Sequence, residues 1–178
     1  MHNNTNQNVQ MYHRNLCEAP VFACPPSFAI QPYKGGRDQD WLRIHQDADL
    51  YNTFTDSMFA EQFGTNEAML CERQFYLVRH GDIAFGTASA WFNKDDGRGR
   101  VHWVAIETEF QGQGLAKPLL STVCQKLVAI GHPDAVLSTS TARVAAINLY
   151  LKFGFEPLMI TADDVEAWNR FFNTDLKS

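Results

Sequence analysis

The chain has 178 residues, of which 45% are hydrophobic and 12% aromatic, enough to bury the core of a single domain. Its formal net charge of −5 excludes a basic nucleic-acid-binding protein and slightly favours an amine substrate. No apolar run reaches the ~18 residues that a membrane span requires, and the four cysteines lack metal-ligand spacing. We therefore expect a cytoplasmic protein with reduced, mostly buried thiols, no metal, and no nucleic-acid or membrane partner.

The first 26 residues predict a disordered tail, because they are rich in Asn and Gln and end at Pro25 and Pro26. They also lack the apolar segment of a signal peptide. Docking of this tail on the domain through Val21 and Phe22 is the alternative. Residues 27–178 are expected to form one domain.

Beyond the tail, hydrophobic periodicity and turn residues predict the order β-α-α-β-β-β-α-β-α-β-α. The expected strands cover residues 27–33, 75–79, 83–92, 100–107, 135–139 and 155–160, with a turn at residues 80–82. One helix is expected to begin near residue 38, and four more are expected over residues 53–63, 115–130, 142–152 and 163–172. The secondary structure of residues 66–72 is ambiguous. This order implies a mixed sheet with helices on both faces.

The strand over residues 100–107 is expected to alternate strictly between two faces of the sheet. One face would then present Val101, Trp103 and Ala105. The other would present His102, Val104 and Ile106, so His102 and Ile106 are expected to point to the same side.

The loop after this strand carries the strongest ligand signal. Residues 111–120 read QGQGLAKPLL, and two glycines at alternate positions leave the first amides of the next helix unobstructed. A helix start of this kind binds anions, because free N–H groups and the positive end of the helix dipole converge there. The local alternative is a glycine-rich turn without a ligand. The pattern is not a Walker loop and lacks the third glycine of a Rossmann fingerprint.

Two further motifs accompany the loop. The loop at residues 111–116 fits the pattern [Gln/Arg]-x-x-Gly-x-[Gly/Ala], and a strand that includes residues 104–106 precedes it. Downstream, residues 146–155 (AINLYLKFGF) fit A-I-x-L-Y-x-x-x-G-F. With these motifs in this order, the chain resembles the GNAT superfamily of acyl-CoA-dependent N-acetyltransferases over roughly residues 27–160. The resemblance implies an α/β fold with a central, mostly antiparallel sheet, helices on both faces, and a splay between the fourth and fifth strands.

The resemblance also implies acetyl-CoA as co-substrate and no metal. The residues that it places at the coenzyme are Val104, Ala105, Ile106, Gln111, Gly112, Gln113, Gly114, Leu115, Ala116 and Lys117. Many members carry an Asn seven residues before the signature Tyr, where this chain has Arg143. Either Arg143 or Asn148 is expected to take over its contact with the coenzyme.

By the same resemblance, Tyr150 is the general acid that protonates the departing thiolate, and the backbone N–H of Ile106 polarises the thioester carbonyl. His102 is the preferred general base, and a purely structural role for His102 is the equal alternative. Glu72, Glu107 and Glu109 are the substitutes for the base. The implied reaction is direct attack by a primary amine, of a small molecule or a peptide, on acetyl-CoA.

Three points stay open at this stage. A non-catalytic acyl-CoA-binding module, and an acyltransferase with another acyl donor or an O-linked acceptor, are the rival functions. The acceptor is expected near residues 41–63 and 91–92, where most aromatic side chains are predicted to be core. The protein is expected to be a monomer or a homodimer.

Overall fold

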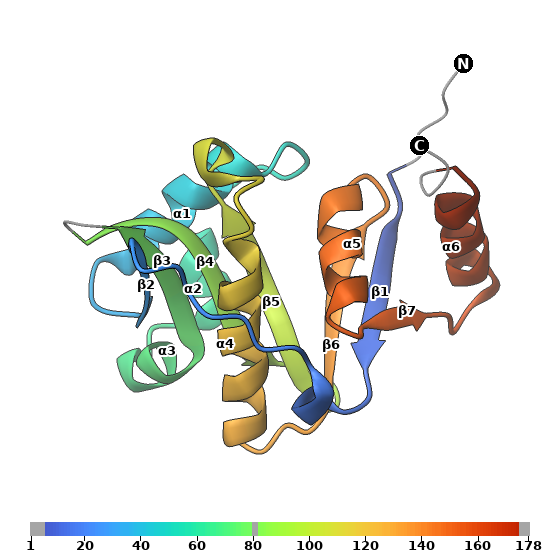
Figure 1. Cartoon of the computed structure of the whole chain (residues 1–178), viewed down its shortest axis with the longest axis horizontal. Helices are drawn as coiled ribbons and strands as arrows, with labels where there is room; N and C mark the ends of the chain where they lie inside the picture. The colour runs from blue at the N-terminus through green and yellow to red at the C-terminus, as the bar shows by residue number, and fades with distance from the viewer. Residues whose placement is uncertain (1–5, 80–81, 175–178) are drawn as a thin grey trace.

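A computed structural model describes residues 6–79 and 82–174 (Figure 1). The strands are β1 (Asn8–His13), β2 (Phe28–Pro32), β3 (Gln74–Arg79), β4 (Ile83–Phe92), β5 (Gly99–Ile106), β6 (Ala135–Ser140) and β7 (Glu156–Leu158). The helices are α1 (Arg37–Ala48), α2 (Met58–Phe63), α3 (Glu67–Arg73), α4 (Ala116–Ala129), α5 (Val144–Lys152) and α6 (Ala162–Thr174), with 3-10 turns η1 (Leu16–Glu18) and η2 (Thr108–Phe110). Of the predicted turn at residues 80–82, residues 80–81 lie outside the described ranges.

The strands form one sheet in the order β2-β3-β4-β5-β6-β1-β7. Every neighbouring pair is antiparallel except β5 and β6, which run parallel. Their parallel pairing is limited to Gly99 with Ala135 and Arg100 with Val136, and beyond these pairs the two strands separate. The predicted α/β fold, with a mostly antiparallel sheet and a splay between these two strands, is therefore confirmed.

The N-terminal segment corrects the predicted tail. β1 lies inside the sheet, where all six of its residues pair with β6 and three of them pair with β7. Its burial alternates, with Val9, Met11 and His13 facing the core and Asn8 and Gln10 exposed. The burial of this face and the ladder hydrogen bonds to two neighbouring strands both favour the ordered strand. The expectation of disorder over residues 1–26 is thus wrong for residues 8–13, and residues 1–5 lie outside the described ranges.

The segment between β1 and β2 packs along α4, as Figure 1 shows for the chain that crosses in front of this helix. The backbone N–H of Phe22 donates to Ser121 Oγ at 3.0 Å, and the Phe22 ring lies 5.6 Å from the Phe153 ring. Val21 is 65% exposed. The docking alternative is therefore correct for Phe22, and Val21 contributes little to it.

β5 corrects the predicted alternation. His102 pairs with Ser89 and Ala105 with Thr87, so β5 has one more residue than β4 in this interval. Trp103 holds φ of 50°, and this extra residue forms a β-bulge. A one-residue insertion moves every following side chain to the opposite face.

As a result, His102 and Trp103 point to the same side of the sheet. His102 contacts Gln62 and Phe63 of α2, and Trp103 joins the core cluster beneath α1 and α2. Ile106 belongs to the opposite cluster, with α4 and α5. The prediction that His102 and Ile106 share one face is therefore wrong.

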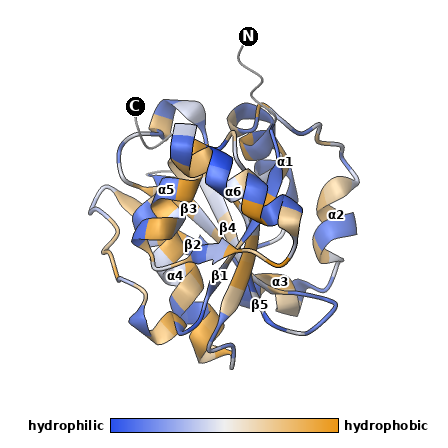
Figure 2. Cartoon of the chain, turned by 90° about the vertical axis from the view of Figure 1, so that its right-hand side faces the viewer, coloured by the Kyte–Doolittle hydropathy of each residue, from blue (hydrophilic) through white to orange (hydrophobic). Residues whose placement is uncertain are grey.

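Two core clusters cover the two sides of the sheet. One joins α1, α2 and α3 to the sheet and contains the buried aromatic residues Trp41, Phe54, Phe59, Phe63 and Trp91. The other joins α4, α5 and α6, and includes Ala167, Trp168 and Phe171 of α6. Figure 2 shows hydrophilic and hydrophobic residues alternating along α6, which packs on β1. The apolar residues of α6 are therefore buried in the core of this chain. The oligomeric state stays a prediction.

Within the described ranges, no helix is both long and apolar enough to cross a membrane. The four cysteines are free thiols, but only Cys124 is buried, while Cys17 and Cys71 are exposed. The expectation of mostly buried thiols is therefore wrong, and the cytoplasmic location stays a prediction.

Candidate active site

A cavity of about 1270 Å³ lies where β5 and β6 separate. Residues of both strands line it, together with the loop after β5, the start of α4, one side of α5 and the segment after α1. Parallel strands that part leave backbone N–H and C=O groups without a ladder partner. The cavity therefore has polar backbone along its wall as well as side chains.

The loop before α4 has the geometry of an anion site. Gly112 and Gly114 have φ of 74° and 77°, and a Cβ on either would meet nothing within 4 Å. The left-handed backbone, rather than crowding, is what requires glycine there. Leu115 precedes α4 without a side-chain cap. The N–H of Lys117 donates to the Gly114 carbonyl at 3.2 Å and Pro118 has no N–H, so Leu115 and Ala116 carry the open amides at the start of the helix. Both glycines, together with Leu115, Ala116 and Lys117, line the cavity, and their predicted contact with the coenzyme stays a prediction.

Two glutamines of the motif stabilise the backbone around this loop. Gln111 Nε2 donates to the Ile106 carbonyl oxygen at 2.8 Å, and Gln111 lines the cavity. Gln113 Nε2 donates to the Glu109 carbonyl at 3.2 Å, but Gln113 is exposed and is not among the lining residues. We therefore assign Gln113 to shaping the loop, while its predicted contact with the coenzyme stays a prediction.

The backbone of Ile106 faces the gap between the strands. The N–H of Glu107 donates to the Phe85 carbonyl of β4 at 2.8 Å. Because successive residues of a strand direct their backbone groups to opposite sides, the N–H and C=O of Ile106 point away from β4, toward β6. The Gln111 amide occupies the carbonyl. The N–H is thus directed at the cavity, as the predicted role in polarising a carbonyl requires.

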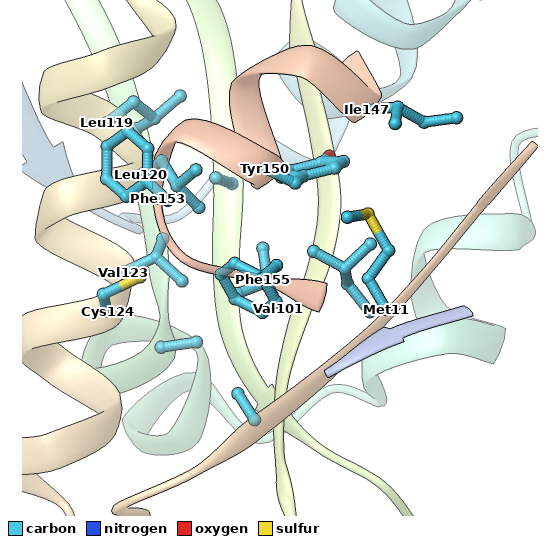
Figure 3. Packing of buried hydrophobic residues seen from close by; sticks show 14 of the residues in the cluster. Met11, Val101, Leu119, Leu120, Val123, Cys124, Ile147, Tyr150, Phe153 and Phe155 are labelled. Atoms are coloured by element: carbon cyan, nitrogen blue, oxygen red, sulfur yellow. The ribbon is translucent and has the colours of Figure 1, made fainter. Parts of the chain in front are cut away.

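Tyr150 lies on the other wall of the cavity. Figure 3 shows its ring, on α5, above Val101 and Met11. The residue is 7% exposed and lines the cavity. Burial raises the pKa of Tyr150 to about 12, although Arg143 acts in the opposite direction. The phenol is therefore protonated at neutral pH and available as a proton donor.

Arg143 is engaged in a contact that the sequence did not suggest. Its guanidinium donates two hydrogen bonds to the Asp49 carboxylate, at 2.8 and 2.9 Å, and lies 5.1 Å from the Tyr51 ring. This ion pair, in which Nη2 of Arg143 contacts both carboxylate oxygens, joins the end of α1 to the start of α5 across the cavity. Arg143 lines the cavity, but Asn148 is not among the lining residues. The predicted coenzyme contact of either residue stays a prediction, and the ion pair disfavours it for Arg143.

His102 lines the cavity from the α2 side, and its hydrogen bonds define its tautomer. Trp103 Nε1, which can only donate, lies 3.1 Å from Gln62 Oε1. Since this oxygen only accepts, His102 Nε2, 3.3 Å from it, must carry the hydrogen. Nδ1 is then the lone-pair nitrogen. Burial, with nearby Arg100, lowers the pKa of His102 to about 3, so the ring is neutral.

His45, on α1, is a second histidine of the cavity wall, and the sequence did not single it out as a site residue. Its Nδ1 donates to the Trp41 carbonyl at 2.8 Å, so Nε2 is the acceptor nitrogen, and within the described chain it has no partner. Burial lowers the pKa of His45 to about 4. The substitute base Glu107 is in an ion pair with Arg43, and Glu72 and Glu109 are exposed.

Lys117 takes part in a contact with the N-terminal segment. Its ammonium lies 5.4 Å from the Phe22 ring, within the range of a cation–π contact. Across the described residues, no group of three or more His, Cys, Asp or Glu side chains is arranged to hold a metal ion.

Comparison with known protein families and proteins agrees with this geometry. The model of the acetyltransferase (GNAT) family matches residues 39–155. N-acetyltransferase 8B of Rattus norvegicus is 36% identical over 86 residues, which are 46% of this chain and 39% of that protein. The aligned part is thus less than half of the length of that relative.

Solved structures show the same fold at low identity. A GCN5-related N-acetyltransferase from Sphaerobacter thermophilus superposes with a TM-score of 0.71 and 17% identity, over 86% of this chain and 49% of that one. A chain of the NatC complex bound to Gag peptide and CoA gives a TM-score of 0.64 and 20% identity, over 75% of this chain and 87% of that one.

Proposed function

This chain belongs to the acetyltransferase (GNAT) family of acyltransferases, and we propose that it transfers an acetyl group from acetyl-CoA to a primary amine in one ternary complex. The supporting observation is a single cavity that extends from the open amides of α4, past Ile106 and Tyr150, to His102. Phosphate, thioester and amine each meet a part of this cavity with matching chemistry.

Acetyl-CoA supplies an activated thioester when bound, and the loop residues fit its phosphate end. The amides around Gly112, Gly114 and Leu115 would hold the pyrophosphate, each helix-end contact contributing about 0.3–2 kcal/mol. The backbone of Val104, along the gap, would pair with the amides of the pantetheine arm, because the Ile106 carbonyl already accepts from Gln111 and the Ile106 N–H faces the thioester. Ala105 would offer the coenzyme no polar group, since its N–H and C=O face β4 and its side chain packs in the cluster beneath α1 and α2.

Two groups act on the thioester in this proposal. The Ile106 N–H is aimed at the carbonyl oxygen, where negative charge develops as the amine attacks, and Tyr150 donates its proton to the departing sulfur. A preorganised backbone donor needs no rearrangement during the reaction. The raised pKa of Tyr150 keeps that proton in place until it is needed.

His102 acts on the amine. Its Nδ1 lone pair is free to accept a hydrogen bond from the attacking nitrogen, because Gln62 holds Nε2. With a pKa of about 3 the imidazole cannot retain the proton, so it orients the amine and the proton passes on to water. Among the cavity-lining residues of the described chain there is no cysteine to form a covalent acyl intermediate, and direct attack requires none.

Calorimetry with acetyl-CoA, followed by thiol release across a panel of amines, tests this function. Binding together with amine-dependent thiol release is the expected result. Binding without release from any amine would instead indicate a non-catalytic acyl-CoA-binding module. Faster release with longer acyl-CoA donors or with hydroxyl acceptors would indicate a different acyltransferase.

A further inference from the structure

Arg100 is a cation in the cavity wall that has no acidic partner. Its guanidinium is partly buried, and its one hydrogen bond, to Ser138 Oγ, is 3.5 Å long. Within the described chain it takes part in no ion pair. Burial lowers the pKa of Arg100, and Asp95 opposes this effect only through space. A desolvated guanidinium without a counter-ion favours binding an anion.

The other charged side chains of the cavity are already engaged. Arg143 pairs with Asp49, and Lys117 lies over the Phe22 ring. The carboxylate of Asp164 accepts from the backbone and hydroxyl of Thr161. Among the described lining residues, Arg100 and Lys117 are thus the two cations in no ion pair. Lys117 belongs to the loop before α4, so Arg100 is the unmatched cation at the other end of the cavity.

The position of Arg100 separates it from the phosphate end of the coenzyme. Arg100 begins β5, whereas the Gly112–Gly114 loop follows the opposite end of that strand. The six steps from Arg100 to Ile106 span about 20 Å at ~3.3 Å per residue. The charge is thus too far from the loop to serve the pyrophosphate, and it lies beyond the point where the thioester carbonyl would meet Ile106.

Arg100 instead lies on the acceptor side. Arg100 lies two residues before His102, and no bulge separates the two, so their side chains point to the same face of the sheet. Neighbouring strands extend this face with Ser138 and Gln10, which are directly paired, exposed, and part of the cavity lining. A guanidinium, a hydroxyl and an amide thus lie next to the group that is proposed to orient the amine.

We propose that Arg100 binds a carboxylate of the acceptor, so that the substrate is a primary amine that also carries a carboxylate, as an amino acid does. A planar guanidinium binds a carboxylate through two parallel hydrogen bonds, and Ser138 and Gln10 supply further donors. This inference rests on the proposed acetyl transfer. The carboxylate is unchanged in the reaction and fixes the amine beside His102.

Acetylation of matched acceptor series tests the proposal. The twenty standard amino acids are compared with their carboxamides and with the corresponding decarboxylated amines. We expect kcat/KM for the best amino acid to exceed that of its carboxamide by about tenfold to a hundredfold, as for a hydrogen-bonded charge pair. Equal or better turnover of the carboxamide would overturn the inference.

Two variants assign the effect to the guanidinium. Arg100→Gln should raise KM for the amino acid by about tenfold or more, and leave KM for acetyl-CoA and the turnover of decarboxylated amines within about twofold. Arg100→Lys should restore part of the loss. The matched control is Arg98→Gln, which removes the same charge two residues earlier from an ion pair with Asp96 outside the cavity. A loss shared equally by all acceptors, or by Arg98→Gln, would refute the assignment.

Binding measurements separate this inference from the proposed reaction. If no amine is acetylated, the amino acid panel is titrated into the protein saturated with CoA. Binding of an amino acid that its carboxamide and Arg100→Gln both lack would support the carboxylate site while the transfer reaction fails. Absence of such binding would overturn the site as well.

Discussion

Met11→Ala tests the placement of the N-terminal strand. Met11 is 0% exposed, and Figure 3 shows it beneath Tyr150 and beside Val101. Truncating a buried methionine to alanine typically lowers the free energy of unfolding by about 2–5 kcal/mol. A loss of about 3 kcal/mol in a domain of this size would lower Tm by about 6–12 °C, at ~2–4 °C per kcal/mol.

Urea unfolding followed by tryptophan fluorescence, with calorimetry for Tm, measures the change. The matched control is Gln10→Ala on the same strand, where the side chain is exposed and the loss should stay within about 0.5 kcal/mol. A disordered N-terminal tail would make both variants equally harmless. A Met11→Ala effect as small as that of Gln10→Ala would therefore refute the insertion of β1 into the sheet.

Three further predictions concern the cavity. Tyr150→Phe should lower kcat by about tenfold to a hundredfold with little change in KM for acetyl-CoA, and steady-state kinetics that show no loss would remove the acid role. Gly114→Val should weaken acetyl-CoA binding by about tenfold in calorimetry, because the residue holds φ of 77°; unchanged affinity would argue against the loop as the phosphate site. Because burial holds the pKa of His45 near 4, below the ordinary 6.5, the unfolded chain binds its proton first as pH falls. Titration of His45 should therefore lower stability by on the order of 3 kcal/mol from about pH 6.5 to pH 4, in addition to the decline from His102. His45→Gln should remove that share in urea titrations.

The part of the candidate site formed by the loop before α4 and by Tyr150 could be predicted because its signals are local. Two glycines next to a helix start determine the loop, and Tyr150 follows from its spacing within one helix. The structure places these residues around one cavity, together with the backbone of Ile106.

The acceptor half depends on long-range pairing, which the local pattern does not report. No glycine marks the bulge at Trp103, yet this one residue decides which face His102 occupies. In hindsight, the spacing of Arg100 is a signal, because a residue two positions before His102 on a strand lies on the same face of the sheet. Its meaning required the knowledge that no acidic side chain lies beside it.

The N-terminal strand was missed for a different reason. Val9, Met11 and His13 do alternate with polar neighbours, but the surrounding Asn and Gln residues make the segment as a whole look disordered. The partners that order it, β6 and β7, are more than a hundred residues away in the sequence.

That separation also sets the order in which the protein can assemble. β1 leaves the ribosome before the other six strands, yet its strand partners among the described residues are residues 135–140 and 156–158. At ~5–20 residues per second, it waits on the order of 6–30 s before its partners are synthesised. The exposed Asn8 and Gln10 keep one face of this waiting strand polar, which protects it from premature pairing with other chains. The strand that is made first is therefore among the last to join the sheet.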